Sequence, residues 1–153
     1  MKKLLVSACL LGENVRFDGK DSQNGSKIIK KWQKDDCLVL LCPEVAGGLS
    51  VPRPPAEIQP DGQIVTIEGA DVTSAFELGA QKALALCREH DIRVAILKEG
   101  SPSCGSSLIN DGNFSHNKIP GQGVTTKLLQ ANGIRVFSEN ELDQAEVYFR
   151  TIA

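Results

Sequence analysis

A short apolar strand and the tight loop that follows it are encoded by Val94-Ala-Ile-Leu-Lys-Glu-Gly-Ser-Pro-Ser-Cys-Gly105. Glycine and proline punctuate this loop, so its backbone has little freedom and can approach other segments closely. Two earlier stretches have the same form, since Leu4-Leu-Val-Ser-Ala-Cys9 and Leu38-Val-Leu-Leu-Cys42 are apolar runs that end on a cysteine. The chain therefore presents Cys9, Cys42 and Cys104 where three predicted strands end.

Segments whose apolar residues recur at helical spacing lie between these strands. The clearest helix is Asp71–His90, in which small and apolar residues recur at helical intervals. Further helices are expected from Asn24 or Ser26 to Lys34, from Gly121 to Asn132 and from Glu139 to Tyr148, with strands at 3–7, 37–41, 63–68, 93–98 and 134–137. This alternation predicts an α/β fold, a three-layer sandwich with a mostly parallel sheet, in a single domain of residues 1–153. Ligands of such sheets bind at the carboxyl ends of the strands. Because each of the three cysteines follows a strand, this arrangement would bring them together.

Three segments carry more specific expectations. Cys37–Leu41 is continuously apolar, as expected of a strand that is buried on both faces. Cys42–Glu57 is rich in proline and glycine, which predicts a long ordered binding loop without regular structure. Ser106–Gln122 is predicted to be a second long loop, and the backbone N–H groups at Gly121 and Gly123 would offer a weak anion site.

The composition is typical of a soluble globular chain. Its 153 residues are 41% hydrophobic and 24% charged, with a net charge of −2. The sequence has no basic block that would indicate a nucleic-acid partner, and its apolar runs are too short to span a membrane. The apolar N-terminus is also too short for a secretion signal and is interpreted as a strand. We therefore expect a cytoplasmic protein without a nucleic-acid or membrane partner; the sequence does not indicate an oligomeric state.

Five cysteines is an odd number, and in a reducing compartment they are expected to be thiols, metal ligands or catalysts. Cys37 opens a strand and Cys87 lies on the buried stripe of a helix, so both are interpreted as small core residues. The three that follow strands predict a joint site. They suit a zinc ion with one water, a 4Fe–4S cluster with one open iron, or a metal-free site with a nucleophilic or persulfide-carrying cysteine. Their spacing does not choose among these, and neither His90 nor His116 is expected to be a ligand.

Four further residues are candidates for the chemistry around the cysteines. Glu44 follows one of them by two positions and could activate water or relay protons. Ser101 and Ser103 either bond their own loop or orient a polar substrate. Arg53 is a candidate substrate-binding residue, with a pair to Glu57 or a role in holding its loop as the structural alternatives.

Four ordered motifs resemble those of the thiouracil desulfidases, a family formerly described only as a domain of unknown function. They are Ser7-Ala-Cys-Leu-Leu-Gly12, Cys42-Pro-Glu-Val-Ala-Gly-Gly-Leu49, Pro52-Arg-Pro-Pro-Ala-Glu57 and Lys98-Glu-Gly-Ser-Pro-Ser-Cys-Gly105, and the match continues to Gly121-Gln-Gly-Val-Thr125. The resemblance covers nearly the whole chain.

The resemblance implies a 4Fe–4S cluster that is held by Cys9, Cys42 and Cys104, with a fourth iron left open. The sulfur of a small-molecule substrate, 2- or 4-thiouracil, would bind that iron, and water would replace it at the ring carbon. Uracil and hydrosulfide would form without net redox change. Glu44 and Ser101 match the positions where the family is expected to handle protons and hold substrate. A persulfide sulfur carrier and a zinc-dependent hydrolase built on the same cysteines are the alternatives.

Overall fold

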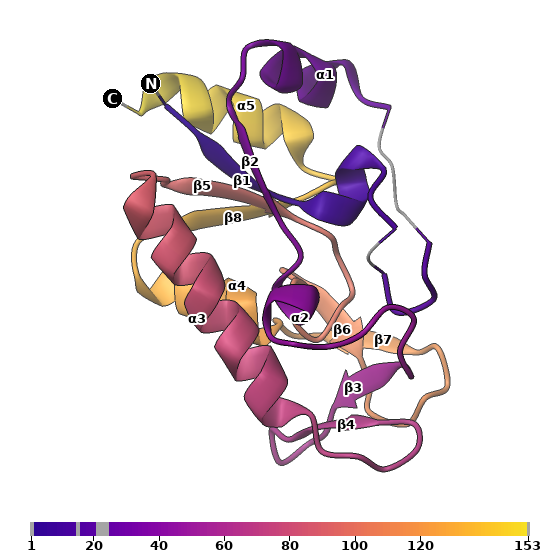
Figure 1. The fold of residues 1–153 in the computed structure, drawn as a ribbon. Helices are drawn as coiled ribbons and strands as arrows, with labels where there is room; N and C mark the ends of the chain where they lie inside the picture. Colours follow the sequence, from indigo (N-terminus) through magenta and orange to yellow (C-terminus); the bar gives the residue numbers. More distant parts are fainter. Residues whose placement is uncertain (1, 15, 21–24, 153) are drawn as a thin grey trace.

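The computed structural model describes residues 2–14, 16–20 and 25–152 of the chain. Its central sheet has four parallel strands in the spatial order β2 (Leu38–Leu41), β1 (Leu4–Ser7), β5 (Val94–Leu97) and β8 (Arg135–Ser138) (Figure 1). Leu5 lies opposite Ala95 where β1 pairs with β5, and Ala95 lies opposite Val136 where β5 pairs with β8. The parallel sheet that the alternating pattern predicts is therefore confirmed.

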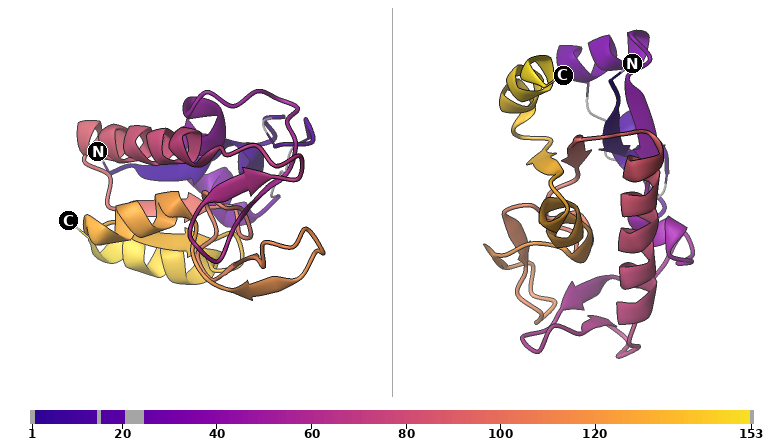
Figure 2. Two further views of the ribbon diagram at one scale, coloured as in Figure 1. Left: turned by 90° about the horizontal axis from the view of Figure 1, so that it is seen from below. Right: turned by 90° about the vertical axis from the view of Figure 1, so that its left-hand side faces the viewer.

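Two helices cover each face of this sheet. In Figure 1, α1 (Lys27–Lys34) and α5 (Leu142–Thr151) lie above it, and α3 (Thr73–Glu89) and α4 (Val124–Ala131) lie below it; Figure 2 shows the same layers from two further sides. Side chains alternate along the strands, so Leu4 and Val6 join the core beneath α1 and α5, while Leu5 joins the core beneath α3 and α4. The three layers agree with the predicted sandwich. Among the residues described, no helix is long and apolar enough to cross a membrane.

The first helix begins at one of the two predicted caps. Ser26 is the cap residue of α1, and its hydroxyl oxygen accepts the backbone N–H of Ile28 at 3.1 Å. Asn24, the other candidate, lies outside the described residues. The spacing predicts that Ile28, Ile29 and Trp32 face the core. Ile29 and Trp32 are buried there, and Ile28 is partly buried against the same cluster.

Two small antiparallel hairpins extend the fold beyond the sheet. β3 (Ala56–Ile58) pairs with β4 (Ile64–Thr66), and β6 (Leu108–Asn110) pairs with β7 (Lys118–Pro120). The prediction of a loop without strands over 106–122 is wrong, because strands of three residues are too short to show an alternating pattern. The prediction for 42–57 is wrong at both ends, since α2 (Pro43–Ala46) occupies its beginning and β3 its end. A proline that follows a cysteine in loop-like sequence suits the first turn of a helix equally well.

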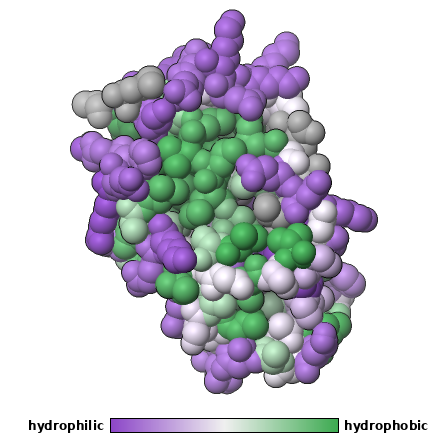
Figure 3. All heavy atoms as spheres, in the orientation of Figure 1, coloured by the Kyte–Doolittle hydropathy of each residue, from purple (hydrophilic) through white to green (hydrophobic). Residues whose placement is uncertain are grey.

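β2 is not buried on both faces, in contrast to the prediction. It is the edge strand of the sheet, and Leu40 is 39% exposed. A continuous apolar run shows that a strand avoids water, but it does not show whether a second strand or a helix covers it. Figure 3 shows that apolar side chains gather on the face of the molecule where β2 lies.

A close contact between α2 and α3 fixes the segment that follows β2. A methyl group on Gly79 of α3 would lie 1.9 Å from the carbonyl oxygen of Pro43, and one on Gly47 would lie 2.0 Å from that of Ala75. Glycine at both positions therefore lets the two backbones touch. Because Pro43 is followed directly by Glu44, this contact also helps to place a predicted site residue.

Gly79→Ala is expected to destabilise the chain by about 1–3 kcal/mol, the usual range for overpacking a tight contact. Helix propensity alone would favour alanine by about 1 kcal/mol, but a clash with backbone atoms cannot be relieved by rotating a side chain. Urea unfolding measures the change. Gln81→Ala, on an exposed position of the same helix, is the control and should change stability little. Equal stabilities for Gly79→Ala and the parent would contradict the close contact.

Candidate functional site

A cavity of about 320 Å³ opens at the carboxyl ends of the parallel strands. Cys9, Cys42 and Cys104 all line it, although they are far apart in the sequence. The strand order explains this convergence, because β2 lies on one side of β1 and β5 lies on the other. The connections therefore diverge between β1 and β5, and such a switch point is where α/β sheets bind ligands. Glu44, Arg53 and Ser101 line the same cavity.

Cys104 lies in the loop after β5 and is 5% exposed. Its backbone N–H donates to Ser101 Oγ at 2.6 Å, and its carbonyl oxygen accepts from Thr126 Oγ1 at 3.0 Å. The hydroxyl of Ser7 donates to its Sγ at 3.7 Å. Burial, with the Glu44 carboxylate nearby, raises the pKa of the Cys104 thiol to about 12. The thiol is therefore protonated at neutral pH in the metal-free chain, and a metal that binds it would displace the proton.

The other two cysteines follow their strands in different local structures. Cys9 is buried in a single 3₁₀ turn, Ala8–Leu11, and Gly12 ends this turn with a φ of 92° that favours glycine. Cys42 is half-buried and directly precedes α2. Burial raises the pKa of its thiol, and the neighbouring Glu44 carboxylate acts in the same direction.

Arg53 forms an ion pair with Glu44 rather than with Glu57. The Nε and Nη2 groups of Arg53 donate to Glu44 Oε1 at 3.2 and 3.1 Å. Burial raises the pKa of Glu44 above that of an ordinary carboxyl group, although Arg53 opposes the shift. Glu57 also lines the cavity, and its Oε1 accepts the backbone N–H groups of Gly112 and Phe114 at 3.0 and 3.2 Å. Of the two structural alternatives for Arg53, the pair with Glu57 is therefore wrong, because proximity in sequence does not reveal which carboxylate lies beside the guanidinium. The other alternative fits the structure, since Arg53 Nη1 donates to the carbonyl oxygen of Ser50 in its own loop at 3.0 Å.

The two serines of the Cys104 loop have different surroundings. Ser101 lines the cavity, and its Oγ accepts the N–H groups of Ser103 and Cys104 at 3.2 and 2.6 Å. These bonds use both lone pairs, so the hydroxyl proton remains to donate to a ligand. Ser103 is fully buried, bonds to Thr125 Oγ1 at 2.7 Å and is not one of the described residues that line the cavity. Its hydroxyl therefore contacts α4, and a role of Ser103 in substrate binding stays a prediction.

The amino end of α4 binds this loop instead of an anion. The N–H groups of Gly121, Gly123 and Val124 donate to the carbonyl oxygens of Ser107, Gly105 and Pro102, at 3.0, 2.8 and 2.9 Å. The anion site predicted at this helix start is therefore wrong, since loop carbonyl groups already take its donors.

Several residues that line the cavity were not predicted. Ser7 Oγ accepts the N–H of Lys98 at 2.9 Å, so this serine joins the ends of β1 and β5 beside Cys104. The sequence feature that could have indicated a role for Ser7 in the site is its position two residues before Cys9. Arg16, His116 and Lys118 also line the cavity. They belong to the segment after β1 and to the β6–β7 hairpin, and no local pattern predicts that these segments reach the site.

The donor set at this site consists of three thiols from three strand ends. Within 2–14, 16–20 and 25–152, no three His, Cys, Asp or Glu side chains are close enough to ligate one metal ion. An iron–sulfur cluster distributes its thiolate ligands over several irons, so thiols spread around one cavity fit such a group.

Known proteins are similar to this chain in sequence and in fold. Residues 4–141 match the family described as 2-thiouracil desulfurase. An uncharacterized protein of Bacillus subtilis (strain 168), YbbK, is 46% identical over 149 residues, which cover 92% of this chain and 97% of that protein. A solved structure described as the [4Fe-4S]-dependent thiouracil desulfidase TudS superposes with a TM-score of 0.96 at 46% identity, over 99% of this chain and all of that one.

Proposed function

Because the chain belongs to the 2-thiouracil desulfurase family, we propose that it is a thiouracil desulfidase that depends on a 4Fe–4S cluster. Its substrate is 2- or 4-thiouracil, and its products are uracil and hydrosulfide. Cys9, Cys42 and Cys104 hold the cluster and leave one iron open. The observation that carries this proposal is the convergence of the three cysteines with Glu44 in one cavity.

The cavity suits such a group chemically. Three buried or half-buried thiols supply soft ligands, and they must lose their protons when the cluster is inserted. When bound, the cluster supplies an open iron with a high affinity for sulfur, which is the atom that distinguishes thiouracil from uracil. Ser7 is already placed to donate a hydrogen bond to the Cys104 thiolate and so to stabilise its charge.

Glu44 is the proposed general base. Its burial raises the pKa of the carboxyl group above its ordinary value, which makes the carboxylate a stronger base than an exposed one. The two hydrogen bonds from Arg53 orient the carboxylate and keep it ionised. Both bonds reach Oε1, and the second carboxylate oxygen would take a proton from water.

The reaction balances without electron transfer. Water forms a C–O bond at the ring carbon that carries sulfur, and the C–S bond breaks. Of the two protons of water, one leaves on hydrosulfide and the other passes to solvent through the base. The Ser101 hydroxyl would donate to a polar atom of the ring, since its lone pairs are occupied by the loop.

Anaerobic reconstitution tests the proposal. We expect about four irons and four sulfides per chain, as a cuboidal cluster requires. The loaded protein should then consume an excess of 4-thiouracil or 2-thiouracil, with loss of the near-ultraviolet absorbance of the thiolated base. Stoichiometric zinc with no iron uptake would favour a zinc hydrolase. A cyanide-releasable persulfide without repeated turnover would favour a sulfur carrier.

A further inference from the structure

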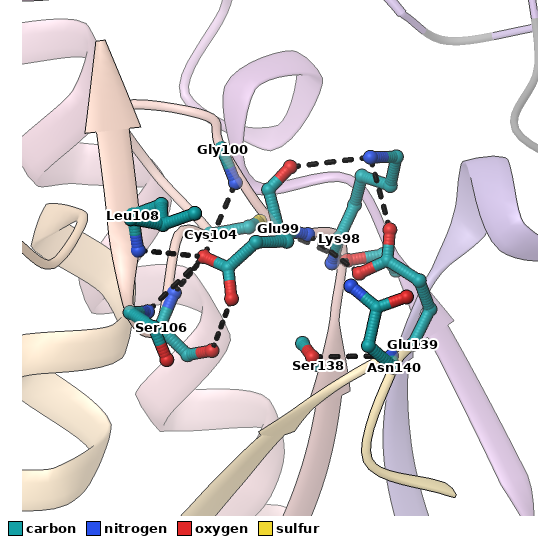
Figure 4. Close-up of polar contacts among 11 residues, drawn as sticks. Lys98, Glu99, Gly100, Cys104, Ser106, Leu108, Ser138, Glu139 and Asn140 are labelled. Carbon is teal, nitrogen blue, oxygen red and sulfur yellow. Dashed lines mark hydrogen bonds and ion pairs between the residues drawn. The ribbon is translucent and has the colours of Figure 1, made fainter. Parts of the chain in front are cut away.

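The carboxylate of Glu99 connects the two ends of the loop that carries Cys104 (Figure 4). Its Oε1 accepts backbone N–H groups from both ends of this loop. The distances are 3.3 Å from Gly100, 2.8 Å from Ser106, 3.1 Å from Ser107 and 3.1 Å from Leu108. Its Oε2 accepts the hydroxyl of Ser106 at 2.9 Å. One side chain therefore closes a loop whose middle contains Ser101 and Cys104.

A second carboxylate fixes the beginning of the loop. Glu139, which follows β8, accepts the N–H of Glu99 at 2.8 Å and pairs with Lys98 Nζ at 2.9 Å. Lys98 Nζ also donates to the carbonyl oxygen of Glu99 at 3.2 Å. Figure 4 shows Glu139 on one side of Glu99 and the returning segment at Ser106 and Leu108 on the other. The loop is thus tied to the neighbouring strand of the sheet at its start and to itself at its end.

We propose that Glu99 is a positioning residue that holds the Cys104 loop closed, with the thiol in place before a cofactor binds. Ordering a loop costs conformational entropy for every residue that is fixed. Hydrogen bonds to an ionised acceptor offset this cost well, because they are roughly twice as strong as neutral ones. The inference deepens the proposed function and rests on it for the identity of the cofactor, but the loop geometry itself does not depend on it.

The same contacts argue against Glu99 as a second base. Its two oxygens already accept five hydrogen bonds from its own loop. Burial opposes its ionisation, but the N–H groups of Ser107, Leu108 and Ser106 and the Ser106 hydroxyl outweigh burial and lower the pKa of Glu99. Glu99 is therefore an ionised anchor for the backbone, whereas the pKa of Glu44 moves in the opposite direction.

Amide hydrogen exchange in the metal-free full chain measures how firmly the loop is closed. The informative reporter is the N–H of Cys104, because it bonds to Ser101 and not to Glu99. We expect Glu99→Ala to speed exchange at this amide by roughly 10- to 100-fold, since several hydrogen bonds to a charged group are lost together. Glu99→Gln keeps the size of the side chain but accepts only neutral bonds, and should give a smaller increase of about threefold.

Asp71→Ala is the matched control. It removes an exposed carboxylate that accepts a backbone N–H, that of Thr73 at 2.9 Å, at the start of α3 and outside the cavity lining. Exchange at Cys104 should not change in this variant. If Glu99→Ala does not fold, Glu99→Gln decides, because its near-identical shape preserves packing. Parental exchange at Cys104 in a folded Glu99→Ala, or in Glu99→Gln where only that variant folds, would overturn the assignment.

Loading with iron separates this inference from the proposed function. Iron-loaded Glu99→Ala should lose iron to a ferrous chelator about tenfold faster than the parent. A parent chain that takes up no iron would refute the proposed function, yet faster exchange at Cys104 in the variants would still uphold the loop assignment. A parent that loads and turns over, with variants that match it in exchange and in iron release, would refute the loop assignment alone.

Discussion

Replacing Cys104 by serine is expected to abolish stable cluster binding and turnover together. A serine hydroxyl is a hard oxygen donor that does not ionise near neutral pH, whereas iron in a cluster requires thiolate sulfur. Cys9→Ser and Cys42→Ser should have the same effect, because each cysteine is supplied by a different strand and cannot substitute for another. Iron and sulfide per chain after anaerobic reconstitution, followed by turnover of 4-thiouracil, measure the loss.

The remaining cysteines provide matched controls. Cys37 is half-buried before β2, where its Sγ donates to the carbonyl oxygen of Asp35 at 3.6 Å, so Cys37→Ser should load a full cluster. Cys87 lies on the buried face of α3 and is 1% exposed. Alanine is the better replacement there, because a buried unpaired hydroxyl costs about 1–3 kcal/mol and would confuse loading with unfolding. A Cys42→Ser chain that kept its full cluster and activity would remove Cys42 from the ligand set.

Glu44→Gln is expected to lower turnover per cluster by roughly 10²–10⁴-fold, the usual contribution of general acid–base catalysis. The amide preserves the shape of the side chain and can still accept hydrogen bonds from Arg53, but it cannot take a proton. Cluster content should therefore match the parent's. Turnover has to be divided by cluster content, since Glu44 follows Cys42 by two residues and a loosened α2 would also lower activity. Near-normal turnover per cluster in this variant would show that water is activated elsewhere.

The pH dependence of turnover gives an independent check on the same carboxylate. A base acts in its ionised form, so turnover per cluster should rise with pH through the pKa of Glu44, which burial places above its ordinary value. Arg53 lowers that pKa, so Arg53→Met should move the rising limb to higher pH. A limb that stays in place in Arg53→Met would assign it to another group.

The convergence of the three cysteines could be predicted from the sequence because it depends on one general property of parallel sheets. All strands of a parallel sheet finish at the same end of the sheet. Apolar runs that end on Cys9, Cys42 and Cys104 therefore place these residues at one end of the sheet whatever the strand order is. The order itself, which puts β2 at the edge, could not be predicted, since an apolar run such as Leu38–Leu41 reads the same at the edge and in the centre.

The polar partners of the site depend on contacts that local sequence does not encode. Arg53 pairs with Glu44, which lies on α2, and local sequence does not show that this carboxylate lies beside the guanidinium. Ser103, a predicted substrate contact, faces Thr125 because α4 packs against its loop. The role of Glu99 could not be predicted from its neighbours in the sequence either. The N–H groups of Ser106 to Leu108 reach its carboxylate only because the loop folds back on itself.

The chain connections leave β1 and β5 in opposite directions, and this topology also affects when the three cysteines come together during folding. Cys9 and Cys42 follow neighbouring strands, β1 and β2, that pair early in the chain order, but Cys104 joins them only when β5 docks on the opposite edge of β1. That pairing joins segments distant in sequence, and such contacts form slowly because the intervening chain must first be closed into a loop. The three thiols therefore meet only when β2 and β5 have both paired with β1. A chain that lacks either pairing offers at most two of them, so we expect cofactor capture to follow both pairings and to stabilise the fold.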